Sequence, residues 1–263
     1  GITTFNNTPT GNTAIYVSGY SPGTVVIDRI IVNSTNGLGV QFCGGNATAS
    51  AALSSGKTIS VGAGGFSSGT LLLRQFTQAG ATPQNFILTG TGILTYGPSS
   101  SFDGDITATS PSLFLNGAVF NGAASFTKTG TTGDYSAGRN VFNGVCSFTN
   151  TGSNYILLGN ANPDTWNDDV TFTNSGSERI LVCWASAGNQ FNGNIYVNSS
   201  GSATAIQFCS SAAATANLAA GKTIQPGLIG LTSGSLILKQ FTQSGTAPVN
   251  LTATGSSAIY LGP

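Results

Sequence analysis

Tandem repetition at two lengths is the sequence feature that most restricts how this chain can fold. Residues 56–59, Gly-Lys-Thr-Ile, return at 221–224, a shift of 221 − 56 = 165 in sequence number. A chain of 263 residues therefore holds about 1.6 copies of a long repeat, which fits a window from a tandem array. We interpret 1–263 as one continuous repeat segment, with a partial copy over 1–98 and a full copy over 99–263.

A shorter repeat lies inside the long one and consists of an aromatic residue followed by Asn-Gly or a variant of it. The fourth and sixth residues after each aromatic are apolar, with a polar residue between them. Such period-two alternation is typical of a half-buried strand. A Gly-containing turn, a second apolar run and a return complete the unit. The aromatic positions are Phe102, Phe120, Phe142, Trp166 and Phe191, with successive intervals of 18, 22, 24 and 25.

A unit of this size cannot bury its own apolar face, whereas stacked units can. The sequence therefore predicts an all-β fold, a right-handed parallel β-helix with about 22–25 residues per coil and ~4.8 Å between coils. A string of immunoglobulin-like sandwiches is the rival fold, but it does not require matching columns of residues at this spacing.

The Phe-Asn-Gly motif has two interpretations. A row of asparagine side chains could bind a ligand or a metal ion. The structural interpretation, which we favour, is a turn in which Gly takes a positive φ, Asn stacks in a ladder and the aromatic fills the interior. This interpretation predicts a turn ladder of Asn121, Asn143, Asn167 and Asn192, and a core stack of Phe120, Phe142, Trp166 and Phe191.

Composition argues against several classes of function. Charged residues make up 6% of the chain, the net charge is zero and there is no histidine. We therefore expect no nucleic-acid partner, and the commonest general base and metal ligand are both absent. No long uninterrupted run of apolar residues occurs, so we expect no membrane insertion. We predict that the chain is not an enzyme and needs no cofactor.

The acidic residues offer little for catalysis. The closest groups are Asp103 with Asp105 and Asp168 with Asp169, and both fall at the same turn in different copies. Some parallel β-helices act on polysaccharides, so a carbohydrate-active or carbohydrate-binding solenoid remains the alternative function. We interpret these pairs as solvated turn residues or, at most, a weak Ca²⁺ site.

The four cysteines form no Cys-x-x-Cys pair. Cys43 and Cys209 are equivalent positions seven coils apart and cannot bridge each other within a straight solenoid. Cys183 and Cys209 could stack in neighbouring coils, either as a disulfide or, as we favour, as a column of buried thiols. Cys146 replaces an aliphatic core residue and should be inert.

Outward threonines and serines raise the further possibility of ice binding, which would need a regular Thr-x-Thr array on one face. The outward residue between the two apolar positions varies too much to favour this function. That residue is Thr107, Ser125, Ser147, Thr171 and Tyr196 in the five copies.

The strings Phe142-Asn143-Gly144, Thr149-Asn150-Thr151-Gly152-Ser153 and Ser186-Ala187-Gly188-Asn189-Gln190-Phe191-Asn192-Gly193 resemble the repeat regions of very large secreted surface proteins of Bacteroidetes-type bacteria. The resemblance covers nearly the whole chain. Such proteins usually end in a type IX secretion sorting domain, which is not among these residues. The resemblance implies a surface adhesin or a component of a filamentous or hook-like appendage, and it supplies no catalytic residues.

These observations lead us to expect an extracellular, cell-surface module with a structural or adhesive role. It would form a rigid rod or a subunit of an appendage, with self-association into a homo-oligomer or filament as the expected interaction. A surface glycan or another cell-surface target is a further candidate partner.

Overall fold

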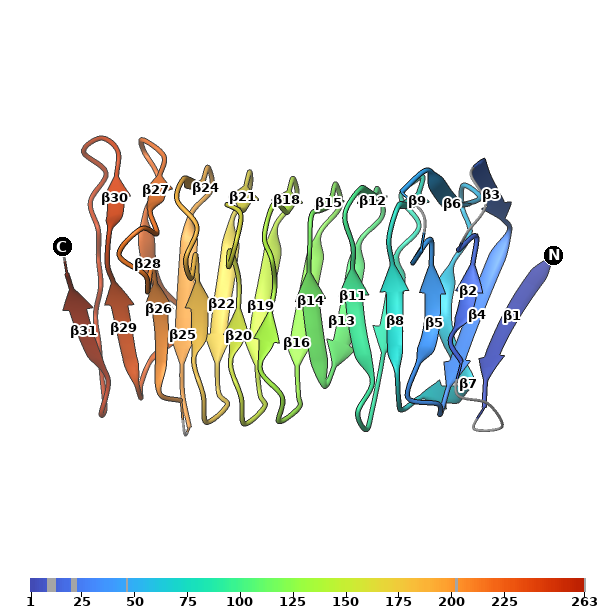
Figure 1. Cartoon of the computed structure of the whole chain (residues 1–263). Helices are drawn as coiled ribbons and strands as arrows, with labels where there is room; N and C mark the ends of the chain where they lie inside the picture. The colour runs from blue at the N-terminus through green and yellow to red at the C-terminus, as the bar shows by residue number, and fades with distance from the viewer. Residues whose placement is uncertain (9–12, 20–22, 46, 202, 263) are drawn as a thin grey trace.

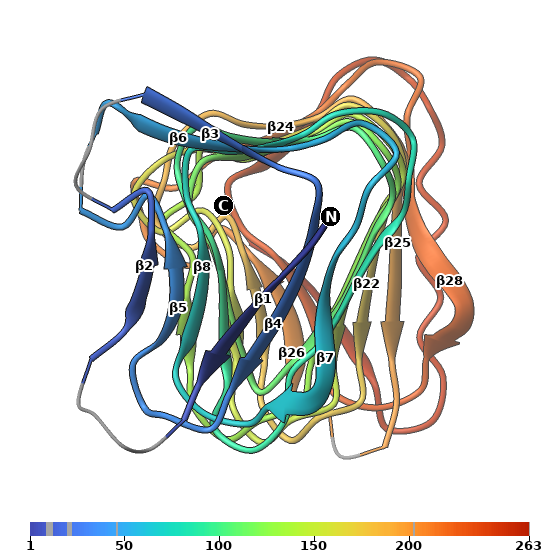
Figure 2. The ribbon, with the colours of Figure 1, turned by 90° about the vertical axis from the view of Figure 1, so that its right-hand side faces the viewer.

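The computed structural model describes residues 1–8, 13–19, 23–45, 47–201 and 203–262. Within these ranges the chain forms 31 strands and no helix, and every strand pairing is parallel. The strands stack into a solenoid of about ten coils, with the two termini at opposite ends (Figure 1). In Figure 2 the N-terminal end faces the viewer and the chain turns clockwise as it recedes, which makes the coil right-handed. The predicted fold class is confirmed.

Each complete coil contributes three strands, one to each side of a roughly triangular cross-section (Figure 2). The sequence predicted only two strands per coil, because the third is short and lies in the segment interpreted as a return. We call the three sides face 1, face 2 and face 3, in the order in which the chain visits them.

Face 1 carries the strands that follow the aromatic motif. They form a three-stranded sheet and a seven-stranded sheet. The first contains β1 (Ile2–Asn7), β4 (Arg29–Ser34) and β7 (Ile59–Phe66), and the second contains β10 (Gln84–Ile87), β13 (Ile106–Ser110), β16 (Ala124–Lys128), β19 (Cys146–Asn150), β22 (Val170–Asn174), β25 (Ile195–Ser199) and β28 (Ile224–Leu231).

Face 2 carries the second apolar run of each unit and is also divided into two sheets. The first contains β2 (Ile15–Val17), β5 (Gly39–Phe42), β8 (Thr70–Leu73), β11 (Ile93–Tyr96) and β14 (Ser112–Leu115), and the second contains β17 (Asp134–Tyr135), β20 (Ile156–Leu157), β23 (Ile180–Val182), β26 (Ala205–Phe208), β29 (Ser235–Leu238) and β31 (Ala258–Leu261).

Face 3 is one sheet of ten strands, and its strands end on the aromatic residue of the motif or on the equivalent position. They are β3 (Gly23–Ile27), β6 (Ala49–Leu53), β9 (Phe76–Gln78), β12 (Ser100–Phe102), β15 (Ala118–Phe120), β18 (Val141–Phe142), β21 (Thr165–Trp166), β24 (Asn189–Phe191), β27 (Ala216–Leu218) and β30 (Phe241–Gln243).

Coil length varies more widely than the sequence motif predicted. A short coil separates Phe102 from its partner Phe120, whereas a much longer one separates Ile195 from its partner Ile224. The longest coils carry their extra residues as a bulge in face 1, where the register of β28 against β25 shifts between Val197 and Ser199. A bulge absorbs added residues without disturbing the neighbouring pairs, so coils of different lengths can stack in one solenoid.

The core is built from columns of like side chains. The rings of Phe120 and Phe142 stack at 5.2 Å between centroids with 3° between their planes, and Trp166 and Phe191 stack at 4.4 Å with 1°. Phe142 and Trp166 connect these two pairs at 5.7 Å. A parallel, in-register pairing places each residue on its equivalent, so one aromatic position per coil becomes a continuous stack.

A second aromatic column runs beside the first from the inner side of face 1. Phe126, Phe148 and Phe172 stack on one another at 5.4 and 5.6 Å. The two columns meet edge to face, for example at 5.5 Å between Phe142 and Phe148. Both arrangements are favoured by the ring quadrupole, and such pairs contribute about 0.5–1.5 kcal/mol beyond their buried area.

Replacement of a ring in the middle of the first column should destabilise several coils together. We expect Phe142→Ala to lower the free energy of unfolding by about 3–5 kcal/mol, because the cavity lies between two stacked neighbours. Hydrogen exchange should show the loss of protection centred on β15, β18 and β21. Tyr135→Ala is the control, since the Tyr135 side chain is exposed. Equal effects of the two substitutions would contradict the importance of the stack.

Candidate functional site

The four asparagines of the motif lie in one row at the corner between face 3 and face 1. Asn143 donates from Nδ2 to Asn121 Oδ1 at 2.7 Å, and Asn167 donates to Asn143 in the same way at 2.7 Å. Asn192 donates to Asn167 at 2.8 Å. All four side chains are exposed, so the row forms a hydrogen-bonded ladder along the surface of the solenoid.

The ladder begins at a carboxylate. Asp103 Oδ1 accepts from Asn121 Nδ2 at 2.7 Å, and Asp103 Oδ2 accepts from the backbone N–H of Gly80 at 3.3 Å. The amide dipoles all point the same way, and the negative charge lies at the end toward which the N–H groups point. This order is electrostatically favourable and polarises each successive hydrogen bond. Asn121, Asn143 and Asn167 each use one donor and one acceptor within the row, and Asn192 donates to it. This pattern supports the structural interpretation of the motif.

The glycines of the motif are required for a reason other than the predicted one. The sequence interpretation gave them a positive φ, but Gly122, Gly144 and Gly193 are not among the glycines with positive φ. Instead, a Cβ on Gly193 would lie 2.2 Å from the backbone carbon of Asp168, and one on Gly144 would lie 2.7 Å from Gly122 O. The motif therefore needs glycine because the backbones of successive coils approach closely at this corner.

The four cysteines are free and buried. Burial raises the pKa of the Cys183 thiol well above its ordinary value, and the neighbouring Cys209 thiol raises it further. Val182 pairs with Phe208, so the next residues, Cys183 and Cys209, lie in neighbouring coils at the corner between face 2 and face 3, and both are free thiols. Burial likewise raises the pKa of Cys146, which occupies an inward position of β19.

The acidic residues of the two turn pairs are engaged by the backbone of the chain. Asp105 Oδ1 accepts from the N–H of Ala123 at 2.9 Å, and Asp169 Oδ1 accepts from the N–H of Asn194 at 2.7 Å. Asp168 Oδ1 accepts from the N–H of Asp169 at 2.8 Å. In the part of the chain that the structure describes, no three Cys, Asp or Glu side chains form a group that could hold a metal ion.

A buried ion pair, which the sequence analysis did not single out, lies where face 2 is interrupted between β14 and β17. The side chains of Lys128 and Asp134 are fully buried, with 3.6 Å between Nζ and Oδ1. Lys128 occupies the inner position that is Asn150 in the next coil, and Asp134 occupies the position of Ile156. Burial raises the pKa of Asp134 to about 7, although the Lys128 charge acts in the opposite direction.

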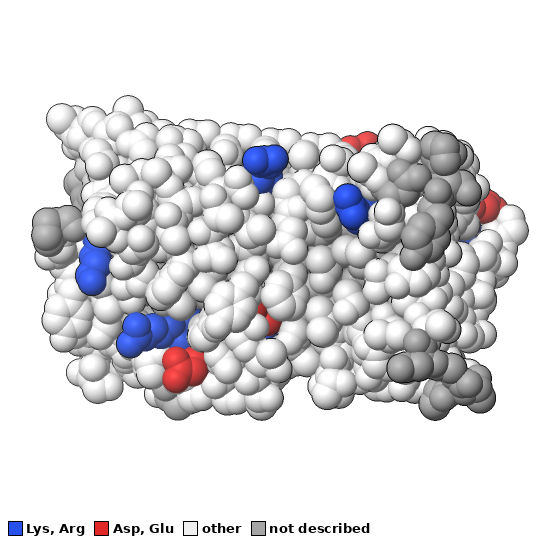
Figure 3. Space-filling model, viewed as in Figure 1, with Lys and Arg blue, Asp and Glu red and all other residues white. Residues whose placement is uncertain are grey.

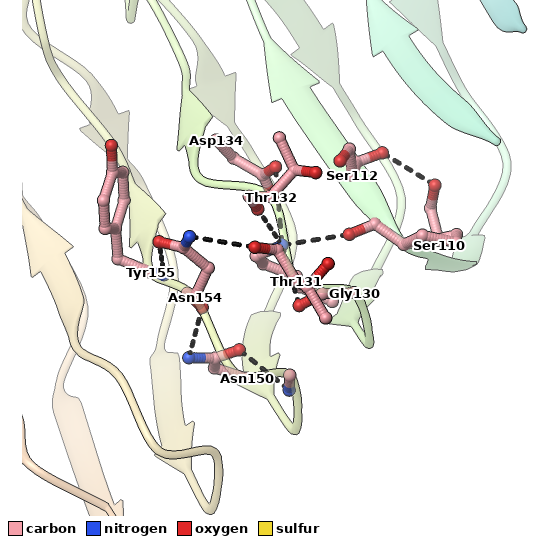
Figure 4. A network of polar contacts seen from close by, with 12 residues as sticks. Ser110, Ser112, Gly130, Thr131, Thr132, Asp134, Asn150, Asn154 and Tyr155 are labelled. Atoms are coloured by element: carbon pink, nitrogen blue, oxygen red, sulfur yellow. Dashed lines mark hydrogen bonds and ion pairs between the residues drawn. The ribbon is translucent and has the colours of Figure 1, made fainter. Parts of the chain in front are cut away.

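The surroundings of Lys128 explain how a buried ammonium group is tolerated. Its Nζ donates to the carbonyl oxygen of Pro111 at 2.9 Å and also to those of Gly130 and Thr132. Figure 4 shows this network, in which Asn154 joins the next coil by donating to Thr131 O at 2.9 Å. The Lys128 side chain thus satisfies carbonyl groups of the turn that a short polar side chain satisfies in other coils.

A second buried carboxyl lies at the corner between face 2 and face 3. Asp164 Oδ1 accepts from both the backbone N–H and Nδ2 of Asn140 at 2.8 Å. Asn140 and Asn189 hold the same position in the adjacent coils. Burial raises the pKa of Asp164 to about 7, and the hydrogen bonds from Asn140 oppose that increase.

On the side that Figure 3 shows, lysines, arginines and acids are few and scattered, and a basic and an acidic group adjoin at the lower left. A shallow hollow on face 1 is lined mainly by small residues, including Ala123, Ser125 and Ser147. On face 2, Tyr135 and Tyr155 pack edge to face, with 5.4 Å between ring centroids and 83° between planes. Because the rings are nearly perpendicular, they do not form one flat platform on which a sugar ring could stack.

No described segment forms a helix that is long and apolar enough to cross a bilayer. Comparisons with family models, with curated proteins and with solved structures found no match to this chain. The resemblance to large bacterial surface proteins therefore stays a prediction from the repeat motifs.

The asparagine ladder can be tested with an asparagine-to-aspartate substitution, which replaces one side-chain NH₂ group by an oxygen. Asn143→Asp removes the donor to Asn121 Oδ1 and places a negative charge against that oxygen, so we expect a loss of about 1 kcal/mol or more in urea unfolding at pH 7. The loss should shrink near pH 3, where the acid is protonated and can donate again. Asn85→Asp is the control, since Asn85 is exposed on β10 and outside the ladder. A loss that is independent of pH would contradict the hydrogen-bonded ladder.

The buried carboxyls predict an unusual dependence of stability on pH. With a folded pKa of about 7 and an unfolded pKa of about 3.9, each binds its proton more tightly in the folded state. The contribution of the two carboxyls to the free energy of unfolding is fully present below about pH 4 and is lost as the pH rises through about 7.

Asp164→Asn should therefore raise stability at pH 8 and flatten the decline between pH 5 and pH 8, as measured by thermal unfolding. Asparagine keeps the acceptor for Asn140 and carries no charge. The matched control is Asp168→Asn, because Asp168 is an exposed turn residue and its replacement should leave the profile unchanged. An unaltered profile in Asp164→Asn would show that this carboxyl is not the titrating group.

Proposed function

We propose that this chain is a structural module of a rigid extracellular rod or cell-surface appendage. The observation that carries the proposal is that the last two strands, β30 and β31, are equivalent to strands inside the solenoid. The shift that relates the two Gly-Lys-Thr-Ile copies also relates β30 to β9 and β31 to β11. In the first copy, β9 pairs with β12 and β11 pairs with β14.

The C-terminal edge thus repeats an edge that another parallel coil covers within the same molecule. A unit of this kind can be added many times, because each new coil meets the same columns as the last. Seven coils per long repeat would extend the rod by about 34 Å at the usual strand spacing of ~4.8 Å. Length is gained without a new fold.

The axial contacts suit a load-bearing rod. Backbone hydrogen bonds join the coils without a break on face 3, and on faces 1 and 2 with one interruption each. The asparagine ladder and the two aromatic columns run in the same direction. The low charge adds little repulsion between neighbouring rods, which favours lateral association into a homo-oligomer or filament. The resemblance to secreted surface proteins supports an extracellular location and an adhesive role.

Chains that carry one, two and three long repeats in tandem would test this proposal by negative-stain electron microscopy. We expect straight particles whose length rises by about 34 Å per added repeat. Side-by-side pairing at higher concentration, measured by sedimentation velocity, would support self-association. Flexible beads, or lengths that do not increase regularly with repeat number, would contradict a rigid rod.

A further inference from the structure

The outer side of face 1 carries two parallel rows of hydroxyl side chains. The first row is the outward position seen in the sequence. The second lies two positions further along each strand and consists of threonine in all four coils, as the register of β13, β16, β19 and β22 shows. The first row is Thr107, Ser125, Ser147 and Thr171, and the second is Thr109, Thr127, Thr149 and Thr173.

The two rows form a regular patch with defined limits. β13, β16, β19 and β22 pair continuously along their whole length without a bulge, so the backbone positions of the eight residues lie in a regular array. The first row also lines the shallow hollow on face 1. The array ends at Tyr196 and Asn198 on β25, next to the bulged β28. None of the eight carries a charge, and the adjacent carboxylate of Asp105 already accepts a backbone hydrogen bond.

Most of these hydroxyl groups are available to solvent. Ser147 bonds to Ser125 at 3.0 Å between Oγ atoms, and Thr173 accepts from Asn198 Nδ2 at 3.2 Å. The other five make no side-chain hydrogen bond to the residues that the structure describes; Thr107 is exposed and the other four are half-buried. These five are Thr107, Thr109, Thr127, Thr149 and Thr171.

The spacing of the array matches that of tetrahedrally bonded water. Two oxygens that bond to one water at ~2.8 Å and at the tetrahedral angle lie about 4.6 Å apart. Neighbouring strands are ~4.8 Å apart, so one water can bridge equivalent hydroxyls that keep this spacing. Ser125 and Ser147 are an exception, because their hydroxyl groups bond to each other directly at 3.0 Å. Along a strand, side chains on the same face are separated by ~6.7 Å, which a chain of two waters can span.

We propose that this hydroxyl array orders a water layer in two dimensions and binds the surface of ice. Threonine suits this role because its methyl group restricts the positions that water can take, while its hydroxyl group bonds to that water. Two other occupants are less well suited. The array has no coplanar aromatic rings for a sugar, and it has no charge for a polyelectrolyte.

The sequence did not predict this array, because serine and tyrosine interrupt the threonines in the first outward row. The second row is uninterrupted threonine until Asn198. In a rod built from long repeats, the patch would recur once per repeat and many patches could engage one crystal together. This inference does not depend on the rod, since a single chain already carries the whole patch.

Ice-affinity partitioning of the whole chain tests the proposal, with microscopy of ice recrystallisation as a second measurement. We expect the protein to concentrate in the slowly grown ice fraction, unlike a soluble protein of similar size that serves as the reference. Thr149→Tyr places a large ring in the middle of the array and should abolish that enrichment. The matched control is Thr165→Tyr, an outward position of β21 on face 3, which should leave the enrichment unchanged.

Circular dichroism and thermal unfolding of both variants would show that they fold alike. Absence of enrichment for the unaltered chain would overturn the proposal, and so would equal loss in the two folded variants. Retention of the unaltered chain on an insoluble polysaccharide, lost in Thr149→Tyr without any binding to ice, would make the face a glycan site and would also overturn the proposal. None of these results would alter the measured length of the rod, so the proposal of ice binding can fail while the proposal of a rigid rod stands.

Discussion

The structure depends on the short, constant distance between successive coils. Parallel pairing holds each strand ~4.8 Å from its neighbour, so every side chain meets the same position of the next coil. Flat aromatic rings can stack at this distance, as Phe142 does on Phe120. Amide groups can donate from one coil to the next, as Asn143 does to Asn121. Where the backbones come closest, only glycine fits, as at Gly193. The repeated motif is therefore the set of residue types that can be stacked on themselves.

Buried polar side chains repeat from coil to coil at the corners of the solenoid. There the strands end, and the side chains bond to backbone groups that have no partner in a neighbouring strand. Asn150 and Asn174 lie inside one corner, where their Nδ2 groups donate to the carbonyl groups of Asn154 and Glu178. Lys128 does the same with a longer side chain and brings Asp134 with it as a counter-charge. A buried ion pair of this kind offsets its own desolvation only in part, which is consistent with the raised pKa of Asp134.

Because the coils are stacked, inward and outward side chains have different roles. The inward columns and the hydrogen bonds of the three faces hold the coils together, so the outward side chains are free to differ from face to face. Face 1 presents hydroxyl rows, whereas face 2 presents the Tyr135 and Tyr155 pair. The bulge of β28 adds a local feature, with Leu228 fully exposed at its tip. A repetitive scaffold can in this way carry distinct surfaces without a change in its core.

The sequence by itself determined the all-β parallel coil, the equivalence of the aromatic positions and the alternation of β13, β16, β19 and β22, because these follow from residue spacing alone. The tertiary structure decided the features that arise between coils. The third strand at Val141 and Phe142 is too short for a periodic signal, and the role of Gly193 appears only where two backbones meet. The partnership of Lys128 with Asp134 depends on a break in face 2. The second threonine row becomes an array only when the register aligns Thr127 with Thr149, since spacing within one coil carries no information about how the next coil is placed upon it.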